Sequence, residues 1–221
     1  MRAILRGMRA LCEAGAAQGG EAAPGFEALL SSVDWEAAPA TESDVIKSDA
    51  IKSDAAEPPP NPPTVERYLA AACEASSPPG SPAGDLAEAL AASGHQLRWK
   101  DMYAEYDDEP DMAVFRRAYA YTLLVGPEAP FRSQRVKVGV TLQGPDVLYP
   151  PHAHKAKELY AVIGGTAEWK RGIEPWTARP PGDFVLHPSG VRHAMQTSAE
   201  PVLALVAWIS DIHSTVVIVR G

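Results

Sequence analysis

Short runs in which apolar residues alternate with polar or small ones occupy the C-terminal half of the chain. The run 135–142, RVKVGVTL, shows the alternation clearly. A period of two places alternate side chains on opposite faces of a β-strand. The predicted strands, bounded by glycine or proline turns, are residues 112–126, 135–142, 144–165, 166–170, 176–179, 184–187, 192–197, 202–209 and 216–219. About nine short strands of this kind predict a closed barrel or two packed sheets.

The N-terminal half has a helical period instead. Ile4, Leu5, Met8 and Leu11 recur at helical spacing with arginines between them, which predicts a short amphipathic helix. Its apolar face is expected to pack against the rest of the protein or a second subunit, with a membrane surface as the alternative. Further helices are predicted over residues 26–35, 65–75 with Thr64 as the cap, and 85–92.

A biased segment separates the helical parts. It contains the tandem repeat IKSDA-IKSDA at 46–55 and ends in a run of prolines. Short duplications and proline runs of this kind are typical of linkers. The predicted organisation is therefore an N-terminal helical segment (1–35), a low-complexity linker (36–63), a helical portion flanking a barrel (64–110) and a β-barrel domain (111–221).

Composition narrows the choice of partners and compartment. The 221 residues carry a formal net charge of −8, which gives no basis for binding a nucleic-acid backbone. Arg6 and Arg9 interrupt the apolar run that a signal peptide would need, and no apolar stretch is long enough to span a membrane. The two cysteines, Cys12 and Cys73, do not suggest a disulfide framework. A cytoplasmic protein is expected.

The candidate chemistry lies in the stretch 144–165, GPDVLYPPHAHKAKELYAVIGG. His152, His154, Glu158 and Tyr160 are all even-numbered, so an extended backbone would point their side chains the same way. A third histidine, His193, follows a Pro-x-Gly turn. Imidazoles with one carboxylate are good ligands for a divalent transition metal, and Zn, Fe(II) and Mn all tolerate such a set. One metal ion per chain is expected.

These residues also resemble the two cupin motifs. His152-x-His154-x3-Glu158-x6-Gly165 is similar to the first motif, although its opening glycine is displaced by two positions. The segment from Gly182 to His193 is similar to the second motif, with Thr197 standing where the family has asparagine. The resemblance implies a mainly β fold, a C-terminal cupin (a double-stranded β-helix or jelly-roll barrel), behind an N-terminal α-helical portion. By analogy with other cupins, a homodimer is expected.

Among cupins, the pattern Y-x-x-H-x-H-x3-E-x-Y, which begins at Tyr149 and ends at Tyr160, resembles the dimethylsulfoniopropionate (DMSP) lyases. These carbon-sulfur lyases release dimethyl sulfide and acrylate from DMSP. The resemblance implies a small-molecule substrate and an ion held by His152, His154, Glu158 and His193.

Elimination from DMSP needs a base for the α proton, and a tyrosine can serve if a metal ion lowers its pKa. Tyr160 is the candidate base, with Tyr149 orienting the substrate or assisting. The alternative is that Tyr160 is a buried tyrosine whose hydroxyl supports a ligand. Aromatic faces can hold a sulfonium, and the candidates for this role are Tyr149, Trp169, Trp176, Phe184 and Trp208. His95, His187 and His213 are interpreted as structural or surface residues.

Two other classes of function stay open. One is a different cupin enzyme, either an Fe(II) dioxygenase or a sugar isomerase or epimerase. Oxygen consumption would separate the dioxygenase from the lyase. The other is a cupin that binds a small ligand without catalysis.

Overall fold

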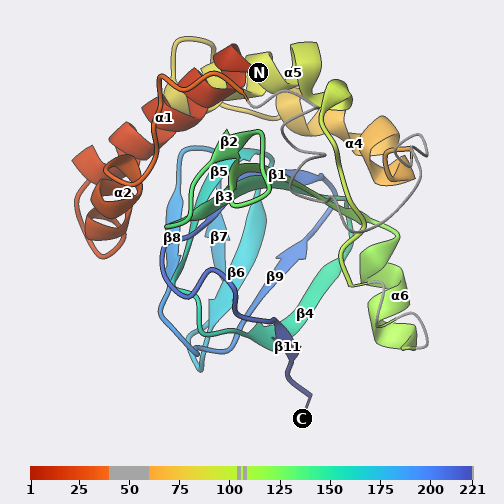
Figure 1. Ribbon diagram of the computed structural model, residues 1–221. Coiled ribbons are helices and arrows are strands. Elements are labelled where there is room, and N and C mark those ends of the chain that lie inside the picture. Colours follow the sequence, from red (N-terminus) through yellow and green to blue (C-terminus); the bar gives the residue numbers. More distant parts are fainter. Residues whose placement is uncertain (40–59, 104–105, 107–108, 221) are drawn as a thin grey trace, which may run out of the picture.

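The computed structural model describes residues 1–39, 60–103, 106 and 109–220. Two mainly antiparallel sheets face each other, and helices cover one of them (Figure 1). The first sheet has the strand order β2-β1-β3-β10-β5-β8 and the second β11-β4-β9-β6-β7. The strands of the first sheet are β1 (Tyr119–Gly126), β2 (Phe131–Arg132), β3 (Lys137–Gln143), β5 (Glu158–Gly164), β8 (Phe184–His187) and β10 (Val202–Trp208). Those of the second are β4 (Leu148–Ala153), β6 (Ala167–Arg171), β7 (Thr177–Arg179), β9 (His193–Thr197) and β11 (Val217–Ile218). The predicted arrangement of two packed sheets is confirmed.

The helices form an arc over the outer face of the first sheet (Figure 1). They are α1 (Arg2–Ala17), α2 (Ala23–Leu30), α4 (Pro63–Glu74) and α5 (Pro82–Ser93), followed by the 3-10 turn η1 (Gly94–Gln96). Ile4, Leu5, Met8 and Leu11 of α1 are buried in one core that also contains strand residues. The prediction that α1 packs against the rest of the protein is therefore confirmed. No described helix is both long and apolar enough to cross a bilayer.

Strand β5 is buried on both faces, because the first sheet lies between the helices and the second sheet. Leu159, Ala161 and Ile163 belong to the core shared with the helices. Tyr160 and Val162 belong to a second core between the two sheets. This division matches the even and odd positions of the sequence, so the even-numbered side chains of β5 point into the space that the sheets enclose.

The end of β5 is docked tightly against α4. Gly165 has a left-handed φ of +72°, and a Cβ there would lie 1.9 Å from the Pro201 carbonyl oxygen. Its amide N–H donates to the Ala75 carbonyl at 3.0 Å, just beyond the C-terminus of α4. The glycine that closes the first motif is therefore required by backbone conformation and by close approach.

Several local predictions were wrong. Residues 144–165 are not one strand but contain β4 and β5, which lie in different sheets and are joined by a loop. Thr64 does not cap its helix, because α4 begins at Pro63 and the Thr64 hydroxyl donates to the Arg117 carbonyl at 3.1 Å. Residues 112–116 are not a strand but part of α6 (Pro110–Arg116). Pro110 sits in the first turn of this helix, and Met112 and Phe115, three positions apart, are fully buried on one side of it.

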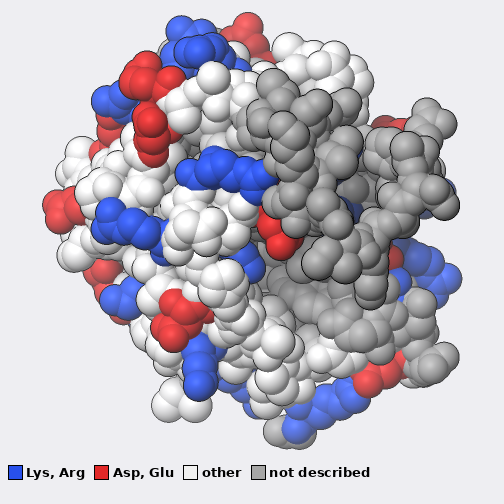
Figure 2. All heavy atoms as spheres, viewed as in Figure 1, with Lys and Arg blue, Asp and Glu red and all other residues white. Residues whose placement is uncertain are grey.

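Most of the predicted linker, residues 40–59 with the tandem repeat, lies outside the described residues. On the face drawn in Figure 2, Lys and Arg are interspersed with Asp and Glu. Among the described residues of that face, no broad surface of one charge is visible.

Candidate metal centre and its cavity

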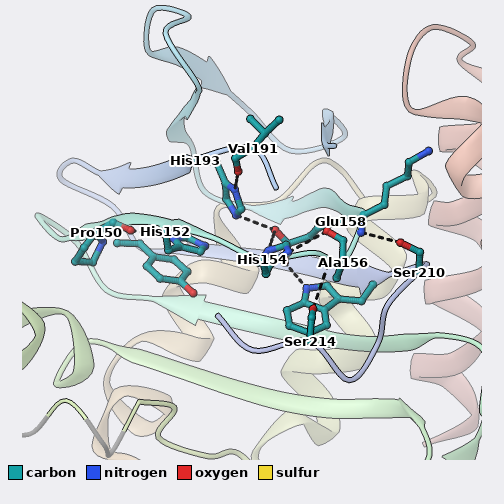
Figure 3. A network of polar contacts seen from close by, with 12 residues as sticks. Pro150, His152, His154, Ala156, Glu158, Val191, His193, Ser210 and Ser214 are labelled. Carbon is teal, nitrogen blue, oxygen red and sulfur yellow. Dashed lines mark hydrogen bonds and ion pairs between the residues drawn. The ribbon is translucent and has the colours of Figure 1, made fainter. Parts of the chain in front are cut away.

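Three strands and one loop bring the candidate ligands together (Figure 3). His152 on β4 lies opposite His193 on β9 in the antiparallel ladder. His154 follows β4 directly, and Glu158 opens β5. The loop between the two strands is anchored by Ser210, whose hydroxyl accepts from the Lys157 amide at 3.1 Å. The four side chains that the two motifs pick out therefore converge between the sheets.

Each of the three histidines is oriented by a backbone carbonyl. The Nδ1 atoms of His152, His154 and His193 lie 2.8 to 2.9 Å from the carbonyl oxygens of Pro150, Ala156 and Val191 (Figure 3). A carbonyl can only accept, so in the neutral rings Nδ1 carries the proton. The lone pair of each neutral ring is then on Nε2, the nitrogen that remains available to a metal ion.

The facing atoms form a set of acceptors that fits a cation. Nε2 of His154 lies 3.4 Å and Nε2 of His193 lies 3.2 Å from Glu158 Oε2. All three atoms are buried and have no hydrogen-bond partner within the described part of the chain. Ligand nitrogens of His152, His154 and His193 lie within 4.8 Å of one another. Buried lone pairs that face a carboxylate repel unless a cation lies among them, so this cluster suits a divalent transition metal.

The second carboxylate oxygen of Glu158 is held by a tryptophan. Trp208 Nε1–H donates to Glu158 Oε1 at 2.7 Å. Trp208 lies opposite Glu158 in the β10–β5 ladder, and its ring lies 4.7 Å from that of His154. This contact leaves Oε2 directed at the histidines, which is the role that outer partners of metal ligands usually play.

The electrostatics of the cluster depend on burial and on Glu158. Burial, together with the neighbouring His193, lowers the pKa of His152 to about 3. Burial also tends to lower the pKa of His154, but its contact with Glu158 outweighs that effect and raises it. Burial would raise the pKa of Glu158, yet His154 and His193 hold it well below its usual value. The carboxylate is therefore ionised, as a metal ligand must be.

A cavity of about 240 Å³ opens onto this cluster. His152, His154 and Glu158 line it, together with Tyr160 and Trp208. The rest of its wall combines aromatic rings, two lysines and a few apolar side chains: Tyr103, Tyr119, Tyr121, Tyr149, Lys100, Lys137, Met102, Leu123, Val206 and Val216.

The two candidate catalytic tyrosines lie in this wall. Tyr160 is buried, and burial, followed by the negative charge of Glu158, raises its pKa well above the usual value. Tyr149 stacks on His152 with ring centroids 4.0 Å apart, and its hydroxyl contacts that of Tyr103. Tyr149 is odd-numbered, and it reaches the cavity because the β4–β9 pairing is irregular between Tyr149 and His152.

The other aromatic candidates occupy different places. Trp169 lies behind Tyr160, with ring centroids 5.9 Å apart, and does not line the cavity. Phe184 packs edge-on against Phe26 of α2 at 5.0 Å. Trp176 lies near Lys170, whose ammonium is 5.8 Å from the ring centroid. Of the five proposed sulfonium contacts, the structure brings Tyr149 and Trp208 to the cavity.

Sequence reasoning missed several residues of the site. Tyr103 comes from the segment before the barrel, where the sequence allowed its aromatic residues either to wall a pocket or to pack one layer on another; the structure places Tyr103 in the cavity wall. Tyr119 and Tyr121 lie in a strand that was predicted without being linked to the site. His187 lies opposite Glu158 in the β5–β8 ladder and is fully buried. Its position inside the second motif, six residues before His193, was the signal that could have drawn it in.

Two facing antiparallel sheets that enclose a cluster of three histidines and one glutamate define a cupin. The chain belongs to the dimethylsulfoniopropionate lyase family, whose model matches residues 40–204. That match covers strands β1 to β9 and the first part of β10. The rest of β10 and all of β11 lie beyond it.

Individual relatives agree with this assignment. The chain is 32% identical over 133 residues to the dimethylsulfoniopropionate lyase DddQ of Ruegeria pomeroyi, a match that covers 60% of this chain and 65% of DddQ. It is 30% identical over 125 residues to DddL of Cereibacter sphaeroides, covering 56% of this chain and 50% of DddL. These matches thus span less than two thirds of either relative.

Solved structures extend the similarity to the whole fold. A chain from the crystal structures of the DMSP lyases RdDddP and RnDddQII superposes with a TM-score of 0.68 at 24% identity, covering 98% of this chain and 96% of that one. The crystal structure of DddQ from Ruegeria pomeroyi gives a TM-score of 0.58 at 29% identity, covering 77% and 86%. The N-terminal helices are thus part of the shared architecture.

Proposed function

We propose that this protein is a metal-dependent lyase that cleaves DMSP to dimethyl sulfide and acrylate by β-elimination. Membership of the DMSP lyase family supports the substrate, since relatives with this fold carry that name. The observation that carries the proposal is the cavity of about 240 Å³ whose wall contains Tyr160 and three of the four proposed ligands, His152, His154 and Glu158. A β-elimination that removes the proton α to a carboxylate requires a base and an electrophilic centre beside the same cavity.

In this proposal His152, His154, Glu158 and His193 hold one divalent ion. When bound, the ion supplies a Lewis acid for the substrate carboxylate and a positive charge that favours the ionised form of a nearby phenol. The chain's own contribution is the fixed Nδ1–H tautomer of each histidine and the Trp208 contact that orients Glu158. Zinc, iron(II) and manganese(II) all suit this donor set.

Tyr160 is the proposed base. Its phenolate oxygen takes the α proton, the electron pair forms the Cα=Cβ bond, and the C–S bond breaks to release dimethyl sulfide. Acrylate and a neutral tyrosine remain, so one proton must leave the site in each turnover. Because burial raises the pKa of Tyr160, the phenol is a poor base unless positive charge lies beside it. This dependence links the base to the bound ion.

The wall of the cavity suits a small zwitterion. Tyrosine rings and Trp208 offer aromatic faces for the dimethylsulfonium group. Lys100 and Lys137 line the same cavity and complement a carboxylate. The ring of Tyr149 stacks on His152 and its hydroxyl contacts that of Tyr103, which supports a role in orienting the substrate or assisting Tyr160.

The test is direct. Purified protein loaded with one divalent ion is incubated with DMSP without oxygen, and dimethyl sulfide in the headspace is measured by gas chromatography. We expect dimethyl sulfide and acrylate in equal amounts, loss of both after chelation, and recovery on adding the ion back. A chelator-treated protein that is free of metal and fully active would refute the metal dependence. A fully metal-loaded protein that releases no dimethyl sulfide would refute the lyase assignment.

A further inference from the structure

His187 is a buried histidine beside the ligand cluster that the proposed reaction does not use. It is completely shielded from solvent, and its ring stacks on that of His193 with centroids 4.0 Å apart and an interplanar angle of 14°. It lies at the end of β8, paired with Glu158 across the ladder. Among the residues that the structure describes, neither of its ring nitrogens finds a hydrogen-bond partner.

This lack of partners sets His187 apart from the three proposed ligands. Each of those holds its Nδ1–H on a backbone carbonyl, whereas His187 has no such anchor. A buried polar group without a partner is costly, and a histidine with a purely structural role normally hydrogen-bonds at least one ring nitrogen. The environment of His187 therefore calls for a partner that the polar groups of the described residues do not supply.

The geometry offers a metal ion as that partner. Ligand atoms of Glu158, His187 and His193 all lie within 4.8 Å of one another, and all three residues are buried. They form a second three-residue set, which shares His193 with the set His152, His154 and His193. We propose that His187 is a fourth imidazole ligand of the same divalent ion.

His187 approaches the cluster from the side away from the substrate. It does not line the cavity that contains His152, His154 and Tyr160. Instead it lines a separate cavity of about 210 Å³ together with Trp169, Arg171 and Phe184. A ligand on this side adds to the hold on the ion without occupying the positions that face the substrate.

Binding requires the His187 ring to turn. Two nearly parallel rings at 4.0 Å cannot both place one ion in their planes at the usual metal–nitrogen distance of about 2.0–2.1 Å. Because no hydrogen bond fixes either ring nitrogen, the rotation breaks none. His187 is thus the adjustable ligand of the set, and the three carbonyl-anchored histidines are the rigid ones.

The inference deepens the proposed function and rests on its metal ion, but its test needs no turnover. Protein with ¹⁵N-labelled histidine is loaded with one Co(II) per chain, and the contact-shifted imidazole resonances are counted by NMR. Each bound ring gives its own shifted set, so we expect four sets in the unaltered protein and three in His187→Gln. Co(II) affinity, measured by competition with a chelator, should fall at least tenfold in His187→Gln. The matched control is His213→Gln, at an exposed position, which should retain four sets and full affinity.

Each outcome of this experiment is decisive. Three sets in the unaltered protein would overturn the role of His187 and leave the other ligands untouched, and this count does not depend on whether the variant folds. A fourth set that persists in His187→Gln would assign it to another histidine and also overturn the inference. No shifted set at all would remove the metal ion, and with it the metal dependence of the proposed lyase.

Discussion

Glu158 is oriented by a residue outside the histidine cluster, since Trp208 Nε1–H donates to its Oε1 at 2.7 Å. Trp208→Phe removes that donor and keeps an aromatic ring in the cavity wall. We expect metal affinity to fall by about 10- to 100-fold, as it does when outer partners of metal ligands are lost. Chelator competition measures the change. The control is Trp176→Phe, at a tryptophan outside the cavity, which should bind metal normally. An equal loss of metal affinity in both variants would contradict the assigned role of Trp208.

At the residue scale, the two motifs predicted the grouping of His152, His154, Glu158 and His193. The even spacing along one extended strand does not explain it, because β4 and β5 lie in different sheets and a loop joins them. Neither the motifs nor the spacing predicted His187, whose burial beside His193 depends on the β5–β8 pairing. Tyr149 shows where the simple alternation of side chains along a strand fails. Strict alternation would place this odd-numbered residue on the other face, and only the irregular pairing after it turns it toward the cavity.

At the scale of elements, α1 is part of the core rather than an appendage. Met8 is fully buried and belongs to the core that includes Leu159 of β5, the strand that carries Glu158 and Tyr160. Met8→Ala should lower the free energy of unfolding by about 2–5 kcal/mol, the usual range for a large-to-small change in a core. Urea unfolding of both proteins measures this change in the free energy of unfolding. Arg6→Ala, on the exposed face of the same helix, should change it little. Similar small effects in both variants would show that α1 contributes little to the core.

Most strands were predictable, because alternation and turn residues bound them. The predicted strand 184–187 coincides with β8, and the prediction 202–209 extends one residue beyond β10. The failure at 112–116 has a physical reason. Valine and phenylalanine favour strands, but Pro110 at the start of α6 and the burial of Met112 and Phe115 on one side select a helix. The sequence allowed Tyr103 to wall a pocket, but its contact with the Tyr149 hydroxyl is tertiary and could not be read from a local pattern.

At the scale of the whole molecule, buried thiol and phenol groups predict how the free energy of unfolding depends on pH. Burial, then Glu74, raises the pKa of the Cys73 thiol to about 12, and burial raises that of Cys12 further. Burial likewise raises the pKa values of Tyr119 and Tyr121. The unfolded chain loses these protons first, from about pH 8.5 for cysteine and about pH 10 for tyrosine. Their stabilising contribution is therefore complete below about pH 8.5 and is lost as the pH rises toward 12.

Urea unfolding at a series of pH values between 7.5 and 11, roughly the window between these reference pKa values, measures this loss. We expect the free energy of unfolding to decline steadily above about pH 8.5. A double variant, Cys12→Ala with Cys73→Ala, should decline less steeply between about pH 8.5 and 10, because only the tyrosines then contribute. A flat profile for the unaltered protein would contradict the burial of these groups.

The most direct test of the central claim, a tyrosine base paired with a bound metal ion, is the turnover of Tyr160→Phe. The change removes one hydroxyl and keeps the ring against Trp169 and His187. General-base catalysis typically contributes about 10²- to 10⁴-fold, so kcat for dimethyl sulfide release should fall by at least about 100-fold. Metal content should stay near one ion per chain, because Tyr160 is not among the proposed metal ligands. Release of dimethyl sulfide at a near-normal rate by the fully metal-loaded variant would contradict the account, and Tyr160 would then be a buried structural tyrosine.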